Sequence, residues 1–67
     1  MNLNDLNAEI ARCGLSIPML AAKIGMSKKT LYSRMREETV FNQKEIVSIS
    51  KVLNLNEKQI LNIFFAK

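Results

Sequence analysis

Basic side chains are concentrated in one short part of this 67-residue chain. Residues 23–36 contain five lysines and arginines and no aspartate or glutamate, whereas the net charge of the whole chain is only +4. The window therefore holds the entire positive excess. Clustered ammonium and guanidinium groups attract polyanions, because each group can pair with a phosphate. The pattern predicts a surface that binds nucleic acid.

The residues that catalytic and metal sites require are missing. The chain has no histidine and a single cysteine, Cys13, which argues against an internal disulfide and a Cys/His zinc site. The six carboxylates are scattered, and no glycine-rich phosphate loop is present. We therefore expect no enzymatic activity, no metal and no cofactor. The lone thiol and the lack of a long apolar run favour the cytoplasm over a membrane.

The spacing of apolar residues predicts a single all-α domain over residues 1–67. Five helices are expected, at residues 4–13, 17–24, 28–36, 43–53 and 57–65. A serine or asparagine stands at the start of each helix as a potential N-cap, with Asn4 capping the first. Asn42 and Glu45 resemble a capping box. No segment has the alternation of a strand, so a compact helical domain is expected.

The second and third expected helices are joined by a turn of about three or four residues. Ala21 is small where the two helices must cross, Gly25 permits a sharp change of direction, and Met26 can fill the angle between them. Leu31 and Met35 lie four residues apart and anchor the third helix to the core. Together these features predict a helix-turn-helix whose second helix is polar and basic outside a narrow buried stripe.

The outward residues of the third helix follow from a rotation of about 100° per residue. Lys29, Ser33 and Arg36 lie opposite the buried stripe, with Lys28 and Tyr32 on one flank and Thr30 and Arg34 on the other. Lysine, serine and threonine can hydrogen-bond base edges in a major groove. The candidates for flanking phosphate contacts are Ser27, Arg34, Arg36, Asn42 and Lys44.

Alternatives remain open at three of these positions. Tyr32 can pack at the edge of the core instead of contacting DNA. Arg34 and Arg36 can form ordinary surface ion pairs with Glu37 or Glu38, which contribute little stability.

The C-terminal helix has more apolar residues than one small core can bury. Phe64 and Phe65 are adjacent and therefore point about 100° apart, so one of them should face outward with Ile60 or Leu61. Such an end is either a frayed apolar terminus or a protein-binding surface, since exposed aromatic clusters are unusual on small proteins. The candidate surface consists of Ile60, Leu61, Phe64 and Phe65.

Two stretches of the sequence resemble a known family. The stretch LAAKIGMSKKTLYSRM, within an order of five helices over about residues 5–64, resembles the phage Cro and repressor type (lambda-repressor-like) of helix-turn-helix domain. TLYSRM followed by FNQKEIVSISKVLNL is similar to small regulators of phages of Gram-positive bacteria. The family's phosphate-contacting glutamine at the start of the second helix is replaced here by Ile17, and its Asn-Gly after the third helix by Glu37-Glu38.

The resemblance implies a transcriptional regulator that reads a two-fold operator in double-stranded DNA. It would work in the cytoplasm of a bacterial host, at the nucleoid, as a homodimer or with a phage repressor. By position, the base-contacting residues would be Lys28, Lys29, Thr30, Tyr32 and Ser33. Some small phage proteins of this fold act instead by binding the phage repressor, so a modulator or antirepressor is the alternative.

Overall fold

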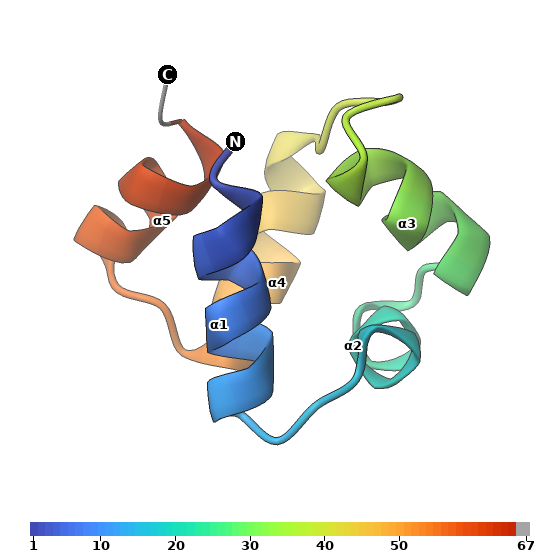
Figure 1. Ribbon diagram of the computed structural model, residues 1–67, viewed down its shortest axis with the longest axis horizontal. Helices are drawn as coiled ribbons and strands as arrows, with labels where there is room; N and C mark the ends of the chain where they lie inside the picture. The colour runs from blue at the N-terminus through green and yellow to red at the C-terminus, as the bar shows by residue number, and fades with distance from the viewer. Residues whose placement is uncertain (66–67) are drawn as a thin grey trace.

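The computed structural model describes residues 1–65, which form five α-helices (Figure 1). They are α1 (Leu3–Arg12), α2 (Ile17–Ile24), α3 (Lys28–Met35), α4 (Gln43–Leu53) and α5 (Glu57–Phe64). No strand occurs within these residues. Figure 1 shows α3 and α5 on opposite sides of the molecule, with α1 and α4 between them. The predicted all-α class and the five helices are confirmed.

The helix boundaries follow the capping side chains. α2 and α4 have the predicted bounds, and the side chains of Asn42 and Glu45 form the predicted capping box. The predicted cap of α1 is wrong: Asn2, not Asn4, is the N-cap, and its Oδ1 accepts from the backbone N–H of Asp5 at 3.1 Å. α1 therefore begins and ends one residue before the predicted limits, while α3 and α5 each end one residue early.

The first four helices end in the same hydrogen-bonded motif. In each, one residue has a positive φ, and the N–H of the next residue donates to the carbonyl five residues back. Gly25 has a φ of 71° after α2, and Met26 then donates to Ala21 at 2.9 Å. After α3 the same position is held by Glu37, with a φ of 61°, and Glu38 donates to Ser33 at 3.0 Å. The motif that follows α3 thus contains two acidic residues, Glu37 and Glu38.

Every helix contributes to one hydrophobic core. α2 packs against α3 and α4, and α5 packs against α1 and α4. The buried apolar residues are Leu6, Ile10, Leu20, Ala21, Leu31, Met35, Phe41, Ile49, Leu53 and Ile63. Because α3 reaches this core only through Leu31 and Met35, most of its surface is left for other contacts.

Phe41 is a core residue that the helical pattern does not reveal. It lies in the α3–α4 connection, yet it is only 9% exposed. Its ring meets that of Phe64 edge to face, with centroids 5.5 Å apart and planes at 81°. Phe65 is 61% exposed, so the prediction that one of the two adjacent phenylalanines faces outward is confirmed.

Candidate nucleic-acid interface

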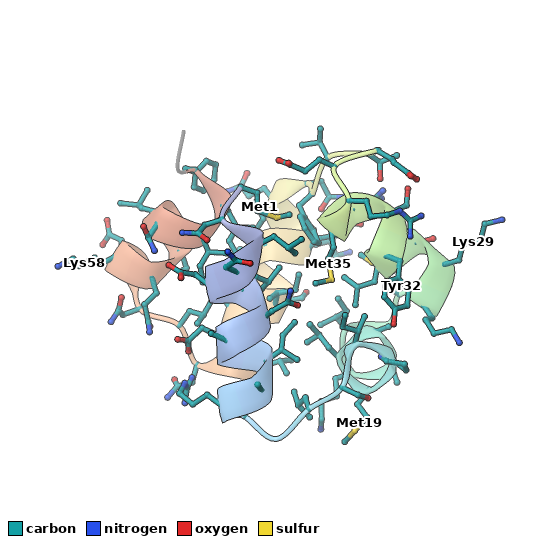
Figure 2. All side chains as sticks on the ribbon, in the orientation of Figure 1. Met1, Met19, Lys29, Tyr32, Met35 and Lys58 are labelled. Atoms are coloured by element: carbon teal, nitrogen blue, oxygen red, sulfur yellow. The ribbon has the colours of Figure 1, made fainter. Side chains whose placement is uncertain are left out.

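The first turn of α3 presents two adjacent lysines on a firmly anchored helix. Leu31 is completely buried and Met35 is 4% exposed, which fixes the rotation of the helix. Lys28 and Lys29 are exposed, and neither forms an ion pair with a carboxylate of residues 1–65. Figure 2 shows Lys29 pointing away from the body of the protein, on the side opposite Lys58. Two ammonium groups are therefore available to a ligand.

The N-terminal end of α3 also presents hydroxyl groups. Ser27 is the N-cap, and its Oγ accepts from the N–H of Thr30 at 3.1 Å. The same hydroxyl donates to Oγ1 of Thr30 at 2.8 Å. Within the described part of the chain no acceptor takes the proton of the Thr30 hydroxyl, so Thr30 can still donate to a base or a phosphate.

The N-terminal end of α4 lies beside the α2–α3 turn. A shallow hollow of about 290 Å³ is lined there by Ile24, Gly25, Met26, Asn42, Lys44, Glu45 and Ser48. Asn42 and Lys44, two of the predicted phosphate contacts, are both exposed. Oδ1 of Asn42 is occupied by the capping bond from Glu45, at 2.8 Å, which leaves its amide protons as donors. These two side chains thus extend the polar surface that begins on α3.

Arg34 is held in an ion pair that the sequence pattern does not suggest. Its Nε and Nη2 donate to the two carboxylate oxygens of Glu45 at 2.8 and 3.1 Å, and Nη1 donates to Oγ1 of Thr39 at 2.7 Å. The predicted alternative of pairing with Glu37 or Glu38 is wrong for this residue. Since both side chains are about four-fifths covered, at 21% and 17% exposure, the pair ties the end of α3 to the start of α4.

Arg36 does form the predicted local ion pair. Its Nε donates to Oε2 of Glu38 at 3.1 Å, and Nη2 donates to Oε1 at 3.2 Å. Oγ of Ser33 donates to the same Oε1 at 3.3 Å. Arg36, and to a smaller extent Ser33, lower the pKa of the Glu38 carboxyl group, which favours its charged form. Two of the predicted DNA-contacting residues thus hold an acidic side chain in this structure.

Two further residues of the basic window differ in position from the lysines of α3. Tyr32 is half-buried and lies toward α2 in Figure 2, which is consistent with a packing role. Lys23 lines a shallow hollow with Cys13, Leu15 and Val52, between α2 and the ends of α1 and α4. The basic window of the sequence is therefore divided between two surfaces.

The predicted protein-binding surface borders an apolar groove. Leu61 and Phe65 are 53% and 61% exposed, whereas Ile60 and Phe64 are half-buried. The groove, of about 700 Å³, runs between α4 and α5. It is lined by Phe41, Gln43, Ile46, Val47, Ser50, Lys51, Asn54, Leu55, Ile60 and Phe65.

The pKa of Glu45 leads to a prediction about acid stability. The hydrogen bond from Arg34, helped by the N–H of Asn42, lowers this pKa below the ordinary 4.5 against the opposing effect of burial. A carboxyl group whose pKa is lower in the folded state stabilises the protein above its unfolded pKa and loses that effect as pH falls through the folded value. Glu45→Gln keeps an oxygen for the capping box, so it removes mainly the ion pair.

We expect Glu45→Gln to lower Tm by a few degrees above pH 5. The difference from the wild type should shrink below pH 4.5 and vanish once the folded pKa is passed. Circular dichroism melts between pH 2.5 and 7 measure this difference in Tm. Arg34→Gln breaks the same ion pair, so its Tm should fall below that of the wild type over the same pH range. A Tm difference that stays constant down to pH 2.5 would contradict the assignment.

No family model, curated protein or solved structure matches this chain. None of the helices in residues 1–65 combines the length and the apolar character needed to cross a membrane.

Proposed function

We propose that this protein is a sequence-specific DNA-binding regulator of the phage Cro and repressor type, with α3 entering the major groove. The observation that supports it most is the pair of exposed lysines, Lys28 and Lys29, on the first turn of a helix that Leu31 and Met35 hold in place. Residues at the N-terminal end of a recognition helix are the ones that reach base edges. The resemblance of the α2–α3 segment to that family points the same way.

The roles of the side chains follow from their chemistry. Lys28 and Lys29 can donate to O6 and N7 of guanine, and Thr30 can donate to a base or a phosphate. Lys44, Asn42 and the N-terminal end of α3 can contact the flanking phosphates, which fixes the position of α3 but carries no sequence information. No bond in this scheme requires Arg34 to leave Glu45. Its predicted phosphate contact stays a prediction.

Fluorescence anisotropy tests the proposal. Duplexes selected from a random 20-base-pair pool serve as ligands, with an unselected pool as the reference. We expect enrichment of a common sequence. The logarithm of the binding constant should fall linearly with the logarithm of the salt concentration, with a slope proportional to the number of phosphate contacts. A failure to enrich any sequence, or an affinity that does not respond to salt, would overturn it.

A second candidate function rests on the groove between α4 and α5. Its exposed apolar rim favours a protein partner, such as a second copy of the chain or a phage repressor. Sedimentation of the protein alone and with its cognate repressor separates this role from DNA binding. If Leu61→Ser and Phe65→Ser leave every such association intact, this surface is not the binding site.

A further inference from the structure

The donors that bind the Glu38 carboxylate can bind a phosphate equally well. A forked guanidinium, from Arg36, and one hydroxyl, from Ser33, donate to its carboxylate at 3.1 to 3.3 Å. Guanidinium groups bind carboxylates and phosphates through the same pair of parallel hydrogen bonds. The side chains of Arg36 and Glu38 are 57% and 58% exposed, so an incoming anion can reach the pair without unfolding any part of the domain.

The hydrogen-bonded motif that ends α3 does not require acidic residues at Glu37 and Glu38. After α1, α2 and α4 the residue that follows the positive-φ position is apolar and packs against the core: Leu15, Met26 and Leu55. After α3 it is the exposed Glu38. The preceding Glu37 takes a left-handed conformation that is unfavourable for any residue with a Cβ. Its Oε1 accepts from the N-terminal ammonium of Met1 at 3.3 Å, an exposed contact that contributes little stability. Residues that break a local rule in this way are frequently found at functional sites.

The two donors lie on the proposed DNA-binding face. Ser33 and Arg36 follow Lys29 at intervals of four and three residues, so the three form one row along the outward side of α3. DNA bound by Lys29 brings its own anionic groups alongside this row. A phosphate that approached Arg36 and Ser33 would meet the Glu38 carboxylate, and like charges repel.

We propose that Glu38 is an intramolecular competitor for DNA, which holds Arg36 and Ser33 in the free protein and releases them to a DNA phosphate. This inference rests on the proposed DNA-binding function. Binding exchanges the carboxylate for the phosphate, so the affinity is lower than it would be if Arg36 and Ser33 were free. Glu38 thereby sets how tightly the domain holds DNA.

The test compares Glu38→Gln with Glu57→Gln, which changes the net charge equally. Glu57 is the first residue of α5, which lies on the other side of the molecule from α3 (Figure 1). It forms no ion pair in residues 1–65. The ligand is a labelled 20-base-pair duplex of random sequence, followed by anisotropy at several salt concentrations. We expect Glu38→Gln to bind about five-fold more tightly in 0.1 M salt, the upper range for an exposed ion pair, and Glu57→Gln less than about two-fold. The salt slope of Glu38→Gln should be steeper by about one.

Arg36→Gln provides a second, independent measurement. In the wild type Arg36 is partly neutralised, so its loss should weaken binding less than about two-fold. In the Glu38→Gln background Arg36 is free, and the same change should cost about five-fold. Thermal melts of each variant confirm that the exposed substitutions leave the fold intact.

The outcomes distinguish a failure of the Glu38 inference from a failure of the proposed DNA-binding function. If the wild type binds no duplex, both are overturned. If it binds, and Glu38→Gln behaves like Glu57→Gln, only the inference is overturned. It is also overturned if Glu38→Gln binds more weakly, because Glu38 would then be a DNA contact that accepts from cytosine.

Discussion

Replacing Lys28 and Lys29 together by glutamine is expected to weaken binding to the selected duplex by about 100-fold. Each side chain is exposed and unpaired within residues 1–65, so neither has to give up a protein contact when DNA arrives. A side chain that pairs with a base edge contributes about 1–3 kcal/mol, of which about 1.4 kcal/mol corresponds to ten-fold. Two independent losses of this size multiply.

The matched control is the double variant Lys23→Gln and Lys58→Gln. It removes the same charge from α2 and α5: Lys23 lies in the hollow with Cys13, Leu15 and Val52, and Figure 2 shows Lys58 on the far side of the molecule from Lys29. Long-range attraction alone should reduce its affinity only a few-fold at 0.15 M salt, where charges more than about 8 Å apart are largely screened. Anisotropy titrations measure both variants. Equal losses would mean that the net charge, and not the surface of α3, determines binding.

The two single variants distinguish base contacts from phosphate contacts. A lysine that reads a base should relax the selected sequence at one position when it is replaced. A lysine that contacts a phosphate should weaken all duplexes alike and reduce the salt slope by about one. Repeating the selection with Lys28→Gln and with Lys29→Gln therefore assigns each residue.

Local sequence signals were sufficient for the helices. Serine and asparagine caps fixed where α2 to α5 begin, and Gly25 and Asn54 marked where α2 and α4 end. The error at α1 arose because Asn2 and Asn4 are equally good caps, and only the fold decides between them. In the structure the N–H of Asn2 donates to the carbonyl of Ile63 at 2.7 Å, which ties the start of α1 to α5.

Long-range contacts were the part that could not be predicted. Glu45 carries one local signal, the capping box with Asn42, and that signal says nothing of Arg34, eleven residues earlier. Phe41 likewise lies in a connection with no periodicity, and only α5 supplies its partner, Phe64. In contrast, Arg36 and Glu38 are two residues apart, so their ion pair could be anticipated from the sequence.

The polar links at the end of α3 have a consequence for the orientation of this helix. Arg34 bridges to Glu45 at the start of α4, and its Nη1 also holds Thr39 of the connection. The lysines of the first turn, however, are some distance from these links along the helix. Their placement depends on packing, and above all on Leu31.

Leu31→Ala is expected to be the most damaging single change to α3. Leu31 is completely buried, and replacing a leucine in such a site by alanine costs about 2–5 kcal/mol. A domain of this size is stable by only about 3–10 kcal/mol. The variant should therefore lose a large part of the domain's stability, and it should lose DNA binding at the lower urea concentration where its helical structure melts. Leu61→Ala makes the same chemical change at a residue that is 53% exposed and should cost less than about 1 kcal/mol.

Urea denaturation followed by circular dichroism compares the two leucine variants with the wild type. If Leu31→Ala folds as stably as Leu61→Ala, then α3 is not held by the core in the way described. Adding a saturating selected duplex gives a further check, because a ligand that binds only the folded state shifts the equilibrium toward it by mass action. DNA should therefore restore part of the helical signal of Leu31→Ala, and the duplex that restores most should be the one the wild type binds best.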